Sequence, residues 1–263
     1  LVNLLKIYAN YVKFKVWNQI VKRVENWVLY DIKNLGENMS ESVLIVGAGS
    51  GLSASIARKC SKQGMNVVLA ARNIEKLKSI AKETQANVFS CDSSEIDQVD
   101  NLFREIDGFK RSIDLVVYNP SARLRGPVHE LDAMKTKKAL DITCFGAFLV
   151  AQQATKRMLS QGYGSIFFTG ASAGVKGFAN SSVFAMGKFG LRGLSQALAR
   201  ELHPKNIHVG HFIIDGVIRA GVGNGGDNWL DPDSIAENYL HVHRQHRSAW
   251  SWEVELRPWV ENF

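Results

Sequence analysis

The sequence has little cysteine, and no two cysteines form a recognisable motif. Its 263 residues contain only Cys60, Cys91 and Cys144, which are widely spaced and include no Cys-x-x-Cys pair. An odd number of scattered thiols argues against a disulfide framework and against a cysteine zinc site, and it is typical of a reducing compartment. We therefore expect a cytoplasmic protein without disulfides.

Long apolar runs, basic clusters and metal-ligand clusters are also missing. No run of about eighteen apolar residues occurs, so we predict no integral membrane segment. The net charge of +7 is dispersed and no nucleic-acid recognition motif accompanies it, so we attribute it to solubility and a phosphate-bearing cofactor rather than to nucleic acid. His241, His243 and His246 have no cysteine or carboxylate cluster beside them, and we expect no metal site.

The most informative stretch that is present runs from Ser42 to Ala57. An apolar run, residues 43–46, predicts a buried strand, and Gly47, Gly49 and Gly51 follow at alternate positions before a small-residue helical pattern begins. Glycines there allow a tight turn and a close approach of the backbone to a ligand. Because the positive end of the helix dipole faces that turn, the arrangement favours a bound phosphate.

A second predicted strand, residues 66–71, tells which dinucleotide to expect. About twenty residues after the glycines, NAD-binding proteins carry an acid that holds the ribose hydroxyls. This chain has Arg72 instead, and a guanidinium suits a 2′-phosphate. We therefore expect NADP(H), with NAD(H) less favoured; the alternative is that Arg72 is a solvated side chain at the start of the next helix.

Strand and helix patterns alternate from Ser42 onward with short connections, which predicts an α/β fold: a Rossmann-type, doubly wound parallel sheet of about seven strands with helices on both faces. Further strands are predicted at 87–90, 113–118, 165–169, 207–214 and 252–256, and helices at 73–84, 95–107, 131–160, 182–202 and from Asp231. Residues 39–263 are therefore predicted to form a single NAD(P)-binding domain.

Residues 1–38 do not follow this alternation. We predict that they are an N-terminal extension outside the fold, since Met39 directly precedes the first strand region. Apolar residues such as Tyr8, Tyr11 and Trp27 leave a second interpretation open, a basic amphipathic helix on a membrane surface or a partner.

From Ser42 to about Pro258 the chain resembles the short-chain dehydrogenase/reductase family. That family carries Thr-Gly-x-x-x-Gly-x-Gly after its first strand; here Gly47 and Gly51 match, while Val46 and Ser53 replace the threonine and the last glycine. The family's Asp after strand three matches Asp92. Its Asn-Asn-Ala-Gly and Pro-Gly segments correspond more loosely to the stretches that begin at Tyr118 and Asp215. The pattern and the resemblance together imply these cofactor-binding residues: Gly47, Gly49, Ser50, Gly51, Leu52, Arg72, Asp92, Asn119, Lys188, Gly216 and Ile218.

The catalytic positions depart from the family. Its Tyr-x-x-x-Lys appears as Phe184-Ala-Met-Gly-Lys188, its catalytic Ser falls on Ala171 and its helix Asn falls on Thr143. The resemblance implies that the missing tyrosine hydroxyl would transfer the proton while hydride moves. Phenylalanine and alanine cannot replace those groups.

Substitutes for the missing groups are Ser172, Thr143 and Ser182, each of which has an alternative role as a cap or turn hydroxyl. Lys188 is a further candidate acid if it is buried, the alternative being a ribose anchor only. Four cations in loops after strand ends could frame an anionic substrate: Arg123, Arg125, Lys176 and Arg219.

These patterns predict an NADP(H)-dependent oxidoreductase of the short-chain dehydrogenase/reductase type that acts on a small carbonyl or alcohol substrate with an atypical proton donor. The alternative is a catalytically inactive NADP(H)-binding protein, a scaffold or redox sensor. Relatives in this family commonly pair two long helices, so the resemblance also implies a homodimer or homotetramer.

We expect NADPH to bind at least about tenfold more tightly than NADH, a difference of about 1.4 kcal/mol, because Arg72 stands in place of an acid. Fluorescence titration of both cofactors measures the ratio, and Arg72→Asp should abolish it. Equal affinities in the parent protein would contradict the assignment.

Overall fold

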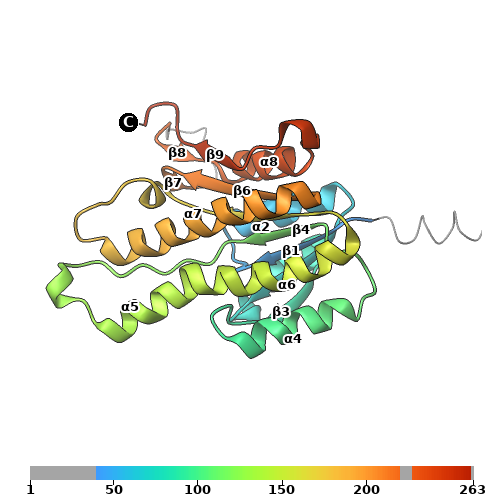
Figure 1. Cartoon of the computed structure of the whole chain (residues 1–263), viewed down its shortest axis with the longest axis horizontal. Helices are drawn as coiled ribbons and strands as arrows, with labels where there is room; N and C mark the ends of the chain where they lie inside the picture. The colour runs from blue at the N-terminus through green and yellow to red at the C-terminus, as the bar shows by residue number, and fades with distance from the viewer. Residues whose placement is uncertain (1–39, 220–226, 262–263) are drawn as a thin grey trace, which may run out of the picture. The chain divides into compact units, whose positions relative to one another are not determined.

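The computed structural model describes residues 40–219 and 227–261. Its centre is a seven-stranded, wholly parallel sheet in the order β3-β2-β1-β4-β5-β6-β9. Helices cover both faces, with α6 and α7 on one side and α2 and α8 on the other (Figure 1). The predicted α/β fold is confirmed. The predicted extension, residues 1–38, lies outside the described residues.

The predicted strands all occur, two of them with later starts. They are β1 (Ser42–Val46), β2 (Asn66–Ala71), β3 (Asn87–Ser90), β4 (Leu115–Tyr118), β5 (Gly164–Thr169), β6 (Ile207–Ile214) and β9 (Glu253–Leu256). A separate pair, β7 (Val217–Ile218) and β8 (Trp229–Leu230), has only two residues in each strand, too short for a periodic pattern to reveal.

The helices are α2 (Leu52–Lys62), α3 (Lys78–Thr84), α4 (Ile96–Asp107), α5 (Ala133–Leu140), α6 (Gly146–Gln161), α7 (Ser182–Leu202) and α8 (Pro232–His243). The prediction that Asn73 caps the helix that ends at about Thr84 is confirmed for the cap, but the first turn after it, Ile74–Leu77, is a 3₁₀ turn and not α-helix. There the Asn73 side chain accepts the Glu75 backbone N–H at 3.1 Å. None of the helices in the described ranges is long and apolar enough to cross a membrane.

The prediction of one uninterrupted helix over 131–160 was also wrong. A π-helical turn, Asp141–Phe145, separates α5 from α6. Here the Tyr118 hydroxyl donates to the Ile142 carbonyl at 2.5 Å, and a Cβ on Gly146 would lie only 2.5 Å from that hydroxyl. The helix therefore presses closely on the end of β4. Such turns are frequent at functional sites.

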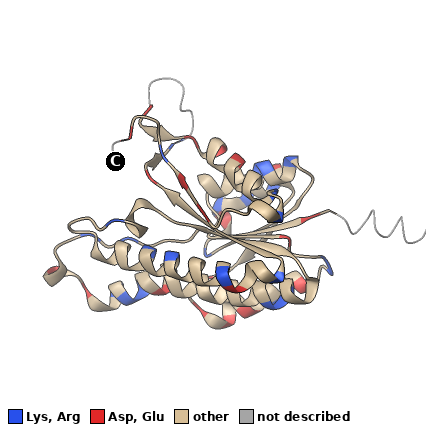
Figure 2. Ribbon diagram, turned by 45° about the horizontal axis from the view of Figure 1, so that its top comes forward, with Lys and Arg blue, Asp and Glu red and all other residues tan. Residues whose placement is uncertain are grey.

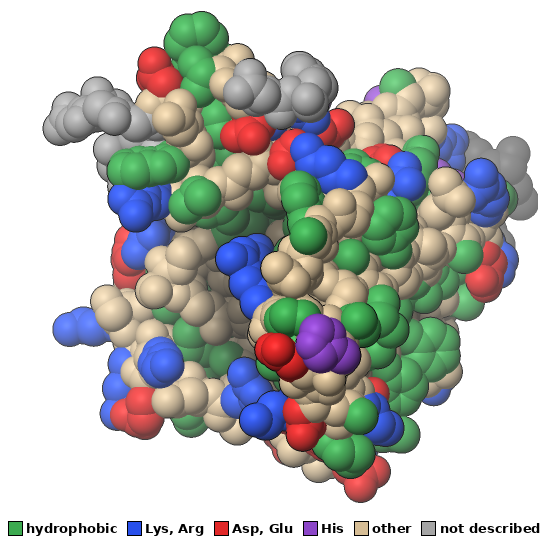
Figure 3. Space-filling view, turned by 90° about the vertical axis from the view of Figure 1, so that its left-hand side faces the viewer, with side chains coloured by type: hydrophobic (Ala, Val, Ile, Leu, Met, Phe, Trp, Pro, Cys, Tyr) green, Lys and Arg blue, Asp and Glu red, His purple; other side chains and the backbone are tan. Residues whose placement is uncertain are grey.

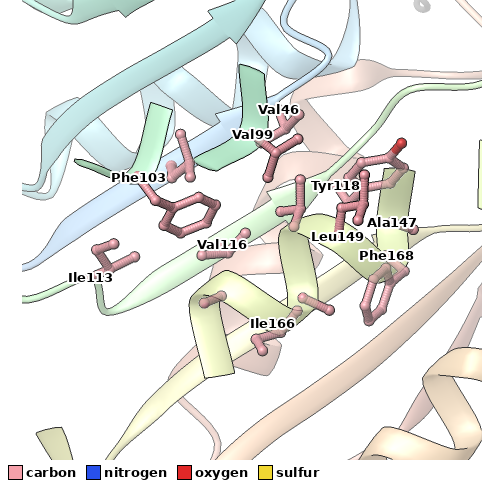
Figure 4. Close-up of a cluster of buried hydrophobic side chains, with 14 of the residues drawn as sticks. Val46, Val99, Phe103, Ile113, Val116, Tyr118, Ala147, Leu149, Ile166 and Phe168 are labelled. Carbon is pink, nitrogen blue, oxygen red and sulfur yellow. The ribbon is translucent and has the colours of Figure 1, made fainter. Parts of the chain in front are cut away.

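Two apolar layers hold the sheet between the helices. Because side chains alternate across a strand, Leu44 and Val46 of β1 face one layer and Val43 and Ile45 face the other. The first layer packs β4 and β5 against α4, α6 and α7, and Figure 4 shows Phe103 of α4 among its members. The second packs the opposite face against α2 and α8. Lys and Arg are scattered along the outer helix surfaces among Asp and Glu (Figure 2).

Candidate functional site

Two cavities lie among the loops that follow the carboxyl ends of the strands, the edge where open parallel sheets bind ligands. The first has a volume of about 440 Å³ and is lined by residues that follow β1, β2, β3 and β4. The second, about 640 Å³, is lined by residues that follow β4, β5 and β6, by the start of α7 and by Glu261. Figure 3 views the molecule from this end and shows a hollowed face bordered by Lys and Arg side chains.

The glycine loop after β1 forms one wall of the first cavity. Gly47 has φ +77°, and a Cβ there would lie 2.6 Å from Pro120, so this position requires glycine. At Gly49 and Gly51 an added Cβ would meet no atom within 4 Å. Gly51 begins α2 without a side-chain cap. The loop therefore leaves bare backbone and an uncovered helix N-terminus, which is suited to phosphate.

Ser53 replaces the family's last glycine and joins this loop to the next one. The Asn119 side-chain amide donates to the Ser53 hydroxyl at 2.7 Å, and that hydroxyl donates to the Gly47 carbonyl at 3.3 Å. The Asn119 backbone N–H donates to the Val46 carbonyl at 3.0 Å. The serine thus stabilises the glycine loop through a side-chain hydrogen bond that glycine could not make.

The opposite wall carries one acid and two cations. Asp92 accepts the backbone N–H of Ser94 at 3.1 Å and its hydroxyl at 2.6 Å. Partial burial alone would raise the pKa of Asp92, but the Ser94 hydrogen bonds and the nearby Lys138 and Arg72 lower it. Arg72 and Lys76 both line the cavity. This wall thus carries a net positive charge, which suits a phosphate group.

Sequence reasoning missed Lys76. Lys76 lies in the 3₁₀ turn Ile74–Leu77 and is exposed, and an exposed lysine carries no local signal in the sequence. Of the other residues predicted to bind cofactor, Gly47, Gly49, Ser50 and Asn119 line the first cavity. The remaining five do not: Gly51, Leu52, Lys188 and Ile218 line neither cavity, and Gly216 lines the second.

The second cavity brings together two of the three catalytic positions at which the chain departs from its family. Ala171 and Phe184 both line it, as does Ser172. The guanidinium carbon of Arg123 lies 4.2 Å from the centre of the Phe184 ring. At the place where the family has a hydroxyl, this chain therefore has an aromatic face with a cation on it.

Lys188 lies near that ring but lines neither cavity. Its Nζ is 5.8 Å from the centre of the Phe184 ring and donates to the Thr169 carbonyl at 2.6 Å. Burial, together with the nearby charge of Arg123, lowers the pKa of Lys188 to about 7. No carboxylate within residues 40–219 or 227–261 forms an ion pair with it. This geometry gives Lys188 no direct path to a ligand in the second cavity.

The remaining hydroxyls separate into two groups. Thr143 is buried, and its hydroxyl accepts the Ala122 backbone N–H at 3.0 Å. A Cβ on Gly187 would lie 2.9 Å from it, so Thr143 packs against α7 rather than facing a cavity. Ser182 also lines neither cavity, which leaves Ser172 as the predicted hydroxyl that does.

The fold and the paired cavities are those of a dinucleotide-binding oxidoreductase. The family profile described as short chain dehydrogenase matches residues 41–223. The chain belongs to the short-chain dehydrogenase/reductase family, whose members are oxidoreductases that act on CH–OH or C=O groups.

Individual relatives agree with this assignment. An uncharacterized oxidoreductase of Staphylococcus aureus is 25% identical over 221 residues, which is 82% of this chain and 96% of that protein. The 3-ketodihydrosphingosine reductase of Mus musculus is 28% identical over 177 residues, 64% of this chain and 53% of that protein. A short-chain dehydrogenase structure from Rhodopseudomonas palustris has a TM-score of 0.75 at 32% identity, covering 83% of this chain and 99% of that one.

We expect Lys188 to make the free energy of unfolding rise with pH above 7. Between its folded pKa of about 7 and the ordinary 10.5, the unfolded chain binds more protons than the folded one. Stability then increases by up to about 1.4 kcal/mol per pH unit. Chemical denaturation between pH 7 and 9 should therefore show that the free energy of unfolding of the wild type rises relative to that of Lys188→Met.

Lys138→Met is the control, because ion pairing with Glu95 raises the pKa of that exposed lysine above the tested range. The free energy of unfolding of Lys138→Met should differ from that of the wild type by the same amount at every pH tested. If the wild-type and Lys188→Met curves ran parallel, the lysine would be charged in the folded state and the assignment would be wrong.

Proposed function

We propose that this protein is an NADP(H)-dependent oxidoreductase that interconverts a small carbonyl compound and its alcohol. The cofactor occupies the first cavity and the substrate the second. The observation that carries the proposal is that one short segment lines both: Asn119, Pro120 and Ser121 line the first cavity, and Arg123 and Arg125 line the second. The same loop thus borders both ligands.

The preference for NADP(H) rests on the charges of the first cavity. Arg72 and Lys76 face a single acid, Asp92, whose oxygens already accept hydrogen bonds from Ser94. Two cations suit the 2′-phosphate that distinguishes NADP(H) from NAD(H). A metagenomic short-chain oxidoreductase of similar fold, with a TM-score of 0.75 at 24% identity, has a structure in complex with NADP, which agrees with this preference without deciding it.

When bound, the cofactor supplies or accepts hydride. The protein's own contribution is to hold the substrate oxygen and to provide its proton. Ser172 is the hydroxyl best placed for this, because it is the predicted hydroxyl that lines the second cavity. In the reducing direction the serine gives its proton to the product oxygen and regains one from water in the open cavity. Lys188 acts as a positioning residue, because it holds the end of β5 that precedes Ser172.

The second candidate function, an inactive NADP(H)-binding scaffold or redox sensor, has a specific observation in its favour. Phe184 and Ala171 line the substrate cavity, and neither side chain can donate a proton or a hydrogen bond. The two candidates share the cofactor site and differ only in turnover. For the compartment we propose the cytoplasm, because Cys60, Cys91 and Cys144 are all free thiols.

We also propose that the protein is a homodimer or homotetramer that buries an exposed apolar surface on α6 and α7. Phe145 and Phe148 stack with ring centres 6.2 Å apart, and both are about two-fifths exposed, as is Phe189; Met186 is more than half exposed. Such a patch is costly in water. Light scattering at micromolar concentration should give at least twice the 29.2 kDa chain mass, and a stable monomer would contradict the proposal.

We expect the parent protein to oxidise NADPH with at least one compound of a carbonyl panel, and Ser172→Ala to lower that rate by about 10²–10⁴-fold, the usual contribution of a proton donor. Ser182→Ala is the matched control, because that serine lines neither cavity. Absorbance of NADPH measures the rate.

The double variant Phe184→Tyr with Ala171→Ser separates the two candidate functions. In an enzyme with its own donor, two added hydroxyls overfill the cavity wall and lower activity or stability. A strong rise from an undetectable parent rate would instead identify the parent as an inactive binding protein.

A further inference from the structure

The second cavity carries more positive charge than the chain itself neutralises. Arg123, Arg125 and Lys176 line it, together with only two carboxylates, Asp215 and Glu261. Asp215 is already engaged, with its carboxylate 3.7 Å from Lys176 and 3.5 Å from Arg257. The two arginines therefore outnumber the one other carboxylate, Glu261, and leave the lining with one uncompensated positive charge.

Neither arginine has an acidic partner in the described part of the chain. Arg123 forms its contact with the face of Phe184, and Arg125 forms no ion pair or side-chain hydrogen bond there. Loss of water lowers the pKa of Arg123, and the nearby charge of Arg125 acts in the same direction. Two like charges held close together in a cavity are unfavourable unless an anion joins them.

The guanidinium of Arg123 determines what kind of anion fits. Its carbon lies 4.2 Å from the centre of the Phe184 ring, and both residues line the cavity. A guanidinium presents its N–H groups as a planar fork, which matches the two oxygens of a carboxylate. Phe184 thus supports the guanidinium at the cavity wall.

We propose that the substrate carries a carboxylate in addition to its reacting oxygen, and that Arg123 binds this carboxylate with support from Arg125. The lining has three cations and two carboxylates, so a single negative charge balances it, whereas a dianionic phosphate would overcompensate. The inference rests on the proposed function only for the reacting carbonyl or alcohol group. Phe184 thereby becomes a specificity residue instead of a lost catalytic one.

Calorimetry on the NADPH-saturated full chain tests the carboxylate directly. Two hydroxy acids, 3-hydroxybutyrate and 4-(hydroxymethyl)benzoate, are compared with their methyl esters; because alcohols do not react with NADPH, the readout is binding alone. We expect at least one acid to bind at least about tenfold more tightly than its ester. Arg123→Gln should abolish the preference, and Arg123→Lys should restore part of it, because it keeps the charge but not the fork.

Arg219→Gln is the matched control. Arg219 also lies over an aromatic ring, 4.0 Å from the centre of Trp229, but it does not line the cavity, so this variant should keep the preference. The proposal would be overturned if acid and ester bound equally, or if 4-(hydroxymethyl)phenyl phosphate bound more tightly than the benzoate. It would also be overturned if Arg219→Gln lost the preference for the acid as fully as Arg123→Gln does.

Failure of this inference is distinguishable from failure of the proposed function. The aldehyde that corresponds to the ester is neutral, and the aldehyde that corresponds to the acid carries the carboxylate. If NADPH were oxidised at the same rate with both aldehydes, the oxidoreductase assignment would stand and the carboxylate site would be ruled out. Preferential binding of the acid without any NADPH oxidation would retain the carboxylate site in a protein that does not turn over.

Discussion

The pairing of β1 with β4 is the constraint on which the site depends. Val46 lies opposite Tyr118 in this register, so the glycine loop and the Asn119 loop leave the sheet side by side. The Tyr118 hydroxyl also lies 3.1 Å from the Ser93 hydroxyl and donates to Ile142, which connects the loop after β3 to the π-helical turn. Burial raises the pKa of this tyrosine, so it stays neutral as a hydrogen-bond donor. One buried pair of strands thereby positions three walls of the first cavity.

The second cavity is organised around the ring of Phe184, which lies near two cations. The guanidinium carbon of Arg123 is 4.2 Å from the ring centre, and the Nζ of Lys188 is 5.8 Å from it. Burial and the charge of Arg123 lower the pKa of Lys188 to about 7, so the neutral form of the lysine is accessible near neutral pH and repulsion between the two cations is reduced. Arg123 lines the cavity, where a substrate would meet it, whereas Lys188 does not line it and donates to the Thr169 carbonyl.

The sequence predicted the parallel fold well because buried strands carry a strong local signal. Short apolar runs bounded by glycine or polar residues identified all seven strands of the sheet, whereas the π-helical turn Asp141–Phe145 escaped prediction. Its helical pattern is continuous, and the turn widens only where the helix presses on Tyr118, a residue 23 positions before Asp141. Lys76 was missed for a related reason, since an exposed lysine has no signal until a cavity forms beside it.

The sequence by itself determined the strand order along the chain, the open glycine loop, the arginine at position 72 and the absence of the family's tyrosine and serine. Each of these is a property of residue type and spacing, which no folding is needed to reveal. Only the tertiary structure decided that Thr143 packs inward, that Ser172 reaches a cavity, and that Arg123 lies on Phe184, 61 positions along the chain. These outcomes depend on which loops the parallel register brings to one edge, and contacts between such distant residues leave no trace in local sequence patterns.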